Sequence, residues 1–412
     1  MFRLQFVSTR YARTQTRPSV STPQNEKNRR KAPEKQHINT QQTTKKTSKH
    51  KKTRVIQTSL YTFTCNGEGR SDEMKRLSDF FNVPMHVFIE LDTEKREHPS
   101  NSELSVVPFV FHKWVRDPFL LTDSQVIVPP SLKYWRGGQL DRRQVNALGD
   151  QIKSALEVIA MKEGLQAAFS PFYFEGGQVL KDDQHVFLPE YMDDSRNFLH
   201  PPSTQNGLNN NSFQTVYDSL LGNTLFVPVL ASDGRMAVGG HLDTLLMPAA
   251  PGKVIMADYE LGAQIAREMD PTQKEIFERK VQAYTKTPGL RLAKDQKQDP
   301  RIDEVARKVA QTLALKYEII SVPFPVFVDP TTPGGENTVF LDYANSLLDL
   351  ASKKAAIPVY GVEAFDEATV AAYNRAGYSN ILRVDSLKTV GDRAGVHCLY
   401  LEVRERTARI NL

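Results

Sequence analysis

The sequence predicts an α/β protein, and three observations support this fold class. From Val55 onward, short apolar runs typical of strands alternate with stretches that have helical spacing. No part of the chain approaches the ~18 apolar residues of a membrane span. The 412 residues are most simply interpreted as one large domain over residues 55–412. The clearest helix is residues 301–316, where one face collects Ile302, Val305, Ala306, Val309 and Leu313.

The N-terminal residues 1–54 differ from the rest in composition. They contain 15 Lys and Arg against two acidic residues, and are otherwise mostly polar. Such a stretch buries too little apolar surface to offset its ordering entropy, so we expect a disordered basic tail. Without it, the totals of 53 basic and 48 acidic residues leave a body with eight more acids than bases. Nucleic acid is therefore expected as a partner only through the tail.

The next elements alternate in the same way. A helix is predicted over 141–163, ended by Gly164. Residues 171–190 are expected to form a strand, a Gly-Gly break, a strand, an Asp-containing turn and a further strand. The Asn-rich residues 203–214 indicate a surface loop or lid, and residues 285–300 a second exposed connector.

Near the C-terminus, a helix over 366–375 is expected to be capped by its first residue, an aspartate, and to end at Gly377 before a strand at 380–385. Cys65 and Cys398 are the only cysteines, which excludes a disulfide framework. We therefore expect an intracellular, cytoplasmic protein. The alternative is organelle targeting, because the Arg- and Ser-rich N-terminus would also suit a transit peptide.

Four short motifs carry the residues that could perform chemistry. "GGHLDTLLMP" contains His241 and Asp243, which would share one face of a strand. In "FEGGQV", Glu175 precedes two glycines that permit a turn, and in "HKWVRDPFLL", Asp117 precedes a proline. "AGVHCLYLEV" contains Cys398. Each motif alone is equally compatible with a turn, a strand end or an inert buried thiol.

Taken together, these residues suit one reaction at a guanidinium group. A guanidinium is always cationic, and two carboxylates such as Asp117 and Asp243 could hold it by paired hydrogen bonds. Its carbon is a poor electrophile and requires a strong nucleophile, which the thiolate of Cys398 would supply. His241 could act first as general acid and then as general base. Glu175 would orient its imidazole, as the third member of a triad does.

The order of these motifs resembles the guanidino-group-modifying enzyme superfamily, over residues of about 105–405. The superfamily includes arginine, agmatine and protein-arginine deiminases and dimethylarginine hydrolases. The resemblance implies the pentein fold, a five-bladed α/β propeller of ββαβ-type modules. "VFLDYANSLL" followed by "IPVYG" is similar to agmatine and protein-arginine deiminases. Two departures affect the expected substrate: Gln178 replaces a frequent acid, and Arg393-Ala394 replaces a usual glycine.

The leading hypothesis is hydrolysis of an arginine-type guanidino group, in a small cationic molecule or in peptidyl-arginine, through a covalent thiouronium. Citrulline and ammonia would be the products of arginine, and no metal or other cofactor is expected. Free arginine would need a cation for its carboxylate, and Arg116, Arg136 and Arg393 are the candidates. His397 is expected either to be a packing residue or to contact one of the catalytic side chains. The alternatives are an amidinotransferase, a dimethylarginine-type hydrolase, and a non-catalytic protein that binds through its basic tail.

Overall fold

The structure is a computed structural model of the chain. All the residues described below belong to one unit, Val55–Thr407. The basic tail, the helix predicted over 141–163, and residues Arg116, Asp117, Arg136 and Arg393 lie outside the described residues, so their predictions stand as they are. The described ranges are 59–63, 71–82, 85–90, 103–107, 120–121, 125–128, 164–194, 197–198, 211–236, 241–295, 298–331, 338–392 and 395–403.

Four three-stranded sheets share one plan. In each, the first strand runs antiparallel to the second, and the third lies parallel to the second. The strands are β4 (Leu120–Leu121), β5 (Gln125–Val128) and β6 (Gln166–Phe169); β7 (Leu180–Lys181), β8 (Val186–Pro189) and β9 (Thr224–Val227); β10 (Leu246–Ala250), β11 (Lys253–Asp258) and β13 (Glu318–Pro323); and β16 (Leu347–Asp349), β17 (Lys354–Val359) and β18 (Asn380–Asp385).

A fifth sheet follows the same plan but takes its first strand from the C-terminal end of the described chain. β19 (Tyr400–Val403) runs antiparallel to β1 (Ser59–Phe63), which is parallel to β2 (Met85–Glu90). β3 (Glu103–Val107) adds a further parallel strand. The first and last described strands are therefore hydrogen-bonded neighbours. The last sheet is antiparallel throughout and consists of β12 (Arg291–Leu292), β14 (Val326–Val328) and β15 (Val339–Phe340).

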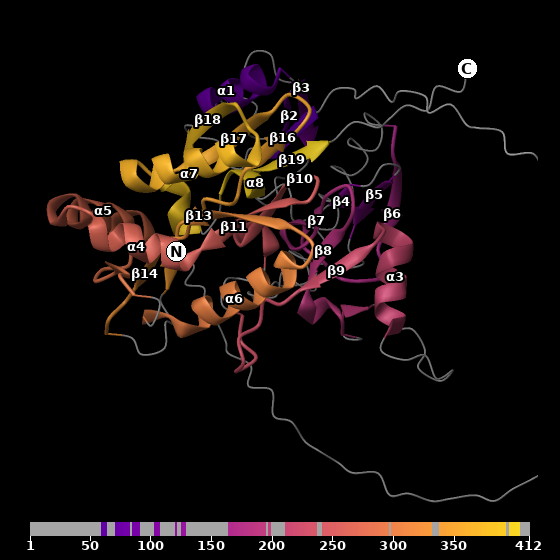
Figure 1. Cartoon of the computed structure of the whole chain (residues 1–412). Coiled ribbons are helices and arrows are strands. Elements are labelled where there is room, and N and C mark those ends of the chain that lie inside the picture. The colour runs from indigo at the N-terminus through magenta and orange to yellow at the C-terminus, as the bar shows by residue number, and fades with distance from the viewer. Residues whose placement is uncertain are drawn as a thin grey trace, which may run out of the picture. The chain divides into compact units, whose positions relative to one another are not determined.

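Helices make the crossovers that parallel neighbours require. Where the crossover is described, the order of each unit is strand, strand, helix, strand. This confirms the predicted α/β class, while the arrangement of the units as five blades stays a prediction (Figure 1). The helices are α1 (Ser71–Phe81) before β2, α3 (Asn211–Leu221) before β9, α4 (Tyr259–Glu268), α5 (Pro271–Thr285) and α6 (Pro300–Ala314) before β13, and α7 (Glu363–Ala376) before β18.

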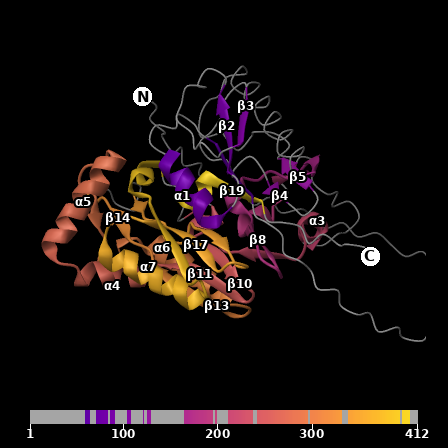
Figure 2. The ribbon, with the colours of Figure 1, turned by 90° about the horizontal axis from the view of Figure 1, so that it is seen from above.

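The largest buried cluster lies where helices cover β11 and β13. Figure 2 shows α7 over these two strands, and both α4 and α6 also contact β13. Ile302, Val305, Val309 and Leu313 of α6 are buried, which confirms the predicted apolar face, whereas Ala306 is half-buried. None of the described helices is both long and apolar enough for a membrane span.

Three local predictions were wrong. Residues 171–174 do not form a strand, because Phe172 and Phe174 turn into a buried aromatic cluster and make one isolated bridge. The predicted loop 203–214 overlaps α3, which begins at Asn211. The last predicted helix begins earlier, at Glu363, so Asp366 lies inside it. Its carboxylate nonetheless accepts from backbone N–H groups just before the helix, as a cap would.

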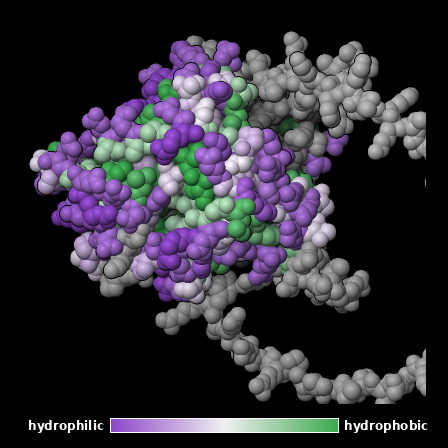
Figure 3. Space-filling model, in the orientation of Figure 1, coloured by the Kyte–Doolittle hydropathy of each residue, from purple (hydrophilic) through white to green (hydrophobic). Residues whose placement is uncertain are grey.

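The surface shown in Figure 3 is mostly hydrophilic over the described residues, with smaller hydrophobic areas between. The predicted connector 285–300 includes β12, whose Leu292 is buried, so only part of it is exposed. Among the described residues, the exposed large apolar side chains are Leu220, Met236, Ile276, Tyr284, Leu315 and Leu350, and of these Ile276 and Tyr284 share one element, α5.

Candidate active site

The site residues lie at equivalent places in the chain. Each lies in or next to a single helical turn, just before the first strand of a sheet. Glu175 precedes a single 3-10 turn that leads to β7, and His241 and Asp243 precede β10. Cys398 lies in the one-turn helix α8 (Val396–Leu399), directly before β19. The common plan of the sheets therefore explains how residues so far apart in sequence come together.

His241 contacts the carboxylate of Glu175 through its ring nitrogen Nε2. Its Nε2 lies 2.5 Å from Glu175 Oε2. Because a carboxylate only accepts hydrogen bonds, Nε2 must carry the proton and donate it. The other ring nitrogen, Nδ1, lies 4.0 Å from Asp243 Oδ1. The imidazole of His241 therefore lies between two carboxylates, where it could act as a general acid and a general base.

Asp243 is the centre of the cluster. Its side chain is fully buried, whereas those of His241 and Glu175 are 20% and 22% exposed. Asp243 Oδ2 accepts from His397 Nδ1 at 2.8 Å and from Cys398 Sγ at 3.5 Å. One carboxylate thus has the thiol at one oxygen and the imidazole of His241 near the other.

Gly177 leaves space for the imidazole of His241 and the carboxylate of Asp243. A Cβ atom added at Gly177 would lie 2.5 Å from His241 Nδ1 and 3.0 Å from Asp243 Oδ1. Any larger residue would therefore displace the imidazole or the carboxylate. Gln178, the departure noted in the motif, is buried, and its Oε1 accepts from the backbone N–H of Glu175 at 2.9 Å. This bond fixes the backbone that carries the Glu175 carboxylate.

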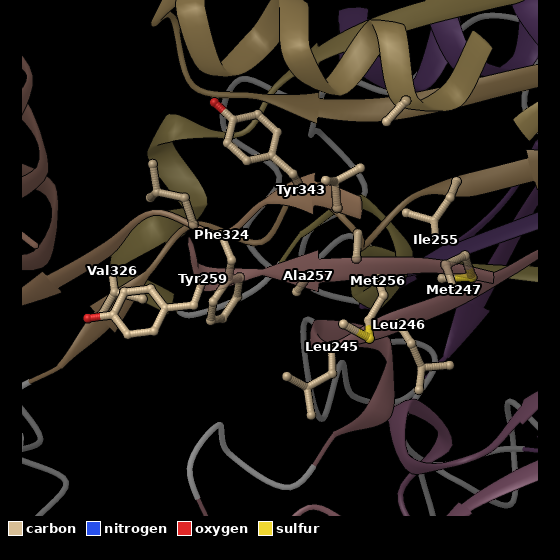
Figure 4. Packing of buried hydrophobic residues seen from close by; sticks show 14 of the residues in the cluster. Leu245, Leu246, Met247, Ile255, Met256, Ala257, Tyr259, Phe324, Val326 and Tyr343 are labelled. Carbon is tan, nitrogen blue, oxygen red and sulfur yellow. The ribbon is translucent and has the colours of Figure 1, made fainter. Parts of the chain in front are cut away.

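Apolar residues anchor the segments that carry Asp243 and Cys398. Leu242, Leu245 and Leu246 are all buried, and Figure 4 shows Leu245 and Leu246 beside Met256 and Ala257 of β11. Burial of each leucine contributes about 1.5–3 kcal/mol relative to exposure, so this segment is held firmly.

The C-terminal segment is anchored in a second cluster. Val396, Leu399 and Tyr400 are buried with Met74 and Leu77 of α1. Buried apolar residues on both sides of the thiol therefore anchor it.

The structure brings together the predicted Glu175, His241, Asp243 and Cys398. One detail of the prediction was wrong, because His241 and Asp243 are not on a strand. His241 has extended backbone and caps the 3-10 turn Leu242–Thr244. The turn forms because the Thr244 hydroxyl donates to the His241 carbonyl at 2.7 Å.

Two buried residues were not predicted as part of the site. The amide of Asn345 bonds to both Cys398 and Asp243. Asp342 is also buried, and within the described residues its carboxylate has only the nearby backbone N–H groups of Ala344 and Asn345, at less than good hydrogen-bond geometry. Burial, followed by the charge of Asp243, raises the pKa of Asp342 well above its usual range. The only sequence signal for either was their place in "VFLDYANSLL", one of the stretches that carried the resemblance.

No group of three or more His, Cys, Asp or Glu side chains in the described ranges is placed to hold a metal ion. The side chains of the cluster offer a nucleophile, an acid and base, and carboxylates for a cation.

Comparison with solved structures identifies the fold. The chain shares the mixed α/β fold of solved pentein-fold proteins, whereas its arrangement as five blades stays a prediction. A protein proposed to be a peptidyl-arginine deiminase matches with a TM-score of 0.59 and 14% identity, covering 86% of this chain and 97% of that one. The Enterococcus faecalis agmatine deiminase gives 0.54 and 17%, covering 85% and 94%. That of C. jejuni gives 0.54 and 12%, covering 86% and 94%.

At these identities the likeness establishes the fold that the motif order implied. No protein-family model matches the chain, and no curated protein matches it by sequence. The activity is therefore argued from the site.

Proposed function

We propose that this protein hydrolyses a terminal guanidinium group of an arginine-type substrate to a ureido group and ammonia. The observation that carries the proposal is the carboxylate of Asp243, with Cys398 Sγ 3.5 Å from one oxygen and His241 Nδ1 4.0 Å from the other. A cation held at this carboxylate would have a nucleophile and a general acid close by. The solved deiminases of the same fold support this assignment.

In the first half-reaction, the thiolate of Cys398 attacks the guanidinium carbon and forms a C–S bond. His241 donates its proton to one amino nitrogen, the C–N bond breaks, and ammonia leaves. A thiouronium then links the substrate to Cys398. Glu175 stabilises the imidazolium before the transfer, because it accepts the hydrogen bond from His241 Nε2 at 2.5 Å.

In the second half-reaction, water attacks the thiouronium carbon. His241, now neutral, takes one proton from that water, and the C–S bond breaks to restore the thiolate. The second proton of the water is released as the ureido carbonyl forms, and the ammonia from the first half-reaction takes it up in solution. The sum is one guanidinium and one water converted to one ureido group and one ammonium ion. The product is neutral, so it leaves the carboxylates without a cation and is bound less strongly than the substrate.

Asp117 is proposed as the second carboxylate for the substrate. It precedes Leu120, the first residue of β4, by the same three residues that separate Asp243 from Leu246, the first of β10. Because β4 and β10 begin sheets of the same plan, this spacing supports equivalent roles. Arg116 and Arg393 are the proposed partners of a substrate carboxylate.

The decisive experiment is a screen of arginine, agmatine, methylated arginines and an arginine-containing peptide. We expect one ammonia and one ureido group per turnover with at least one of them. Cys398→Ala should abolish turnover while retaining substrate binding, because the carboxylates remain.

Three results would overturn the proposal. The first is ammonia release by the alanine variant, and the second is no product from any substrate. The third is transfer of the amidino group to an added amine without ammonia, which would indicate an amidinotransferase.

A further inference from the structure

The geometry points to Asn345 as a positioning residue that fixes the sulfur of Cys398 and favours its thiolate form. Its side chain is fully buried and is hydrogen-bonded to two segments that are remote from it in sequence, at Asp243 and at Cys398. This inference rests on the proposed function, in which Cys398 is the nucleophile. It goes further by naming the group that prepares that nucleophile.

Three hydrogen bonds define the orientation of the Asn345 amide. Its Oδ1 accepts from the backbone N–H of Cys398 at 3.2 Å. Its Nδ2 donates to the backbone carbonyl of Asp243 at 3.2 Å and to Cys398 Sγ at 3.3 Å. A flipped amide would place the oxygen against the carbonyl and the nitrogen against the N–H, so both backbone bonds would be lost. The donor group must therefore face the sulfur.

The backbone of Asn345 adds to this connection. Its carbonyl accepts from the N–H groups of Val396 at 3.1 Å and His397 at 3.3 Å, at the start of α8. These N–H groups have no partner inside a helix, because they belong to its first turn. Asn345 thus completes the N-terminus of the helix that carries Cys398 and also contacts its thiol.

Buried tyrosines hold the turn that carries Asn345. The Tyr360 hydroxyl accepts from the backbone N–H of Asp342 at 3.1 Å. The Tyr373 hydroxyl lies 3.0 Å from the Tyr343 carbonyl and 2.8 Å from Ser346 Oγ. A positioning side chain acts only if its own geometry is fixed, and these contacts fix it.

The glycine of "AGVHC" makes the close approach feasible. A Cβ atom added at Gly395 would lie 2.5 Å from both Cβ and Oδ1 of Asn345. Glycine at this position therefore allows the Asn345 amide to reach the thiol. This contact gives a second, independent way to displace the amide.

Two groups within hydrogen-bonding range of the sulfur act on its charge in opposite directions. The Asp243 carboxylate, 3.5 Å away, disfavours a negative sulfur, whereas the Asn345 N–H favours it. Removing the donor takes away the favourable contact and leaves the unfavourable one in place. We therefore expect the thiol to ionise at higher pH without Asn345.

The test measures the alkylation rate of Cys398 by iodoacetamide in the full-length protein, across the range around the ordinary thiol pKa of about 8.5. Mass spectrometry of the peptide that contains Cys398 separates it from Cys65. Asn345→Ala should move the midpoint of the rate profile upward by about one pH unit. Asn345→Asp keeps the shape but replaces the donor by a charged acceptor, so it should move the midpoint further. Gly395→Ala should shift it in the same direction.

The control is Asn197→Ala. Asn197 is also buried, and its amide donates to the Tyr191 carbonyl away from the thiol. This variant should lower the thermal midpoint without moving the alkylation profile. The inference is overturned if the profile of Asn345→Ala, or of Asn345→Asp where the alanine variant does not fold, stays at the wild-type midpoint. It is also overturned if Asn197→Ala shifts the profile equally.

Alkylation needs no substrate, so the two proposals fail separately. A shifted midpoint without any ureido product would leave Asn345 as the residue that prepares a reactive thiol and would overturn the proposed reaction. Ureido product with an unshifted midpoint would do the reverse.

Discussion

Replacement of Gly177 by alanine tests how strictly the imidazole of His241 must be placed. The new Cβ would lie 2.5 Å from Nδ1, whereas ordinary van der Waals contact begins at 3.4 Å, so the ring must withdraw by about 0.9 Å. That movement would break its 2.5 Å hydrogen bond to Glu175. A misplacement of about 1 Å can cost about 100-fold in rate, so we expect kcat to fall by about that factor.

The assay is ammonia release from the substrate identified by the screen, with the thermal midpoint measured in parallel. Overpacking a buried site costs typically about 1–3 kcal/mol of stability, so a loss of stability alone is not informative. Gly262→Ala is the matched control. Gly262 lies in α4, away from the site, and a Cβ atom added there would lie 2.5 Å from the Phe324 carbonyl oxygen. It should lower stability and leave kcat unchanged. Wild-type kcat in Gly177→Ala, or an equal loss in Gly262→Ala, would refute the reasoning.

Three further variants each replace one ionisable side chain and test its effect on kcat or on stability. Glu175→Gln should lower kcat by about 10²–10⁴-fold, because the neutral amide is a weaker acceptor for the proton on His241 Nε2 and holds the imidazole less firmly; an unchanged kcat would contradict this. The raised pKa of Asp342 means that the folded protein binds the proton of this carboxyl group more tightly than the unfolded chain does. The stability of the wild-type protein should therefore fall as pH rises above about 4, the ordinary pKa of an aspartate. Asp342→Asn should remove this fall, as measured by thermal midpoints between acid and neutral pH. Burial, followed by the charge of Lys294, lowers the pKa of Lys274 to about 8. Stability should therefore rise between this value and the unfolded pKa of about 10.4, and an equal rise in Lys274→Met, measured by chemical denaturation, would contradict it.

Much of the local structure could be predicted because it depends on neighbouring residues. The apolar spacing of 301–316 predicted α6, and Gly377, with its left-handed backbone at φ 106°, ends α7 as expected. The strand at 380–385 was also correct. Helix α5 was not predicted, because its buried face combines Phe277 and Val281 with the charged Lys274 and Glu278, so the apolar residues alone do not outline it. Residues 171–174 failed because aromatic burial in tertiary contacts overrode their local preference for a strand.

The sequence by itself determined which side chains are chemically suitable, and their order along the chain. Cys398, His241 and Glu175 were chosen because a thiol, an imidazole and a carboxylate suit attack on a guanidinium. The placement of Asp243 and Cys398 before strands could also be predicted in part, since an apolar run follows each of them in the sequence.

Only the tertiary structure decided the distances and the environment. Glu175 and His241 are 66 residues apart, and Cys398 is 155 from Asp243, so no local pattern encodes their contact. The pairing of β1 with β19 that brings the C-terminal strand beside the N-terminal one is equally non-local. Asn345 and Asp342 look like ordinary turn residues in sequence. Their significance comes from complete burial against the thiol and against Asp243, because burial is what makes a hydrogen bond or a charge costly to leave unmatched.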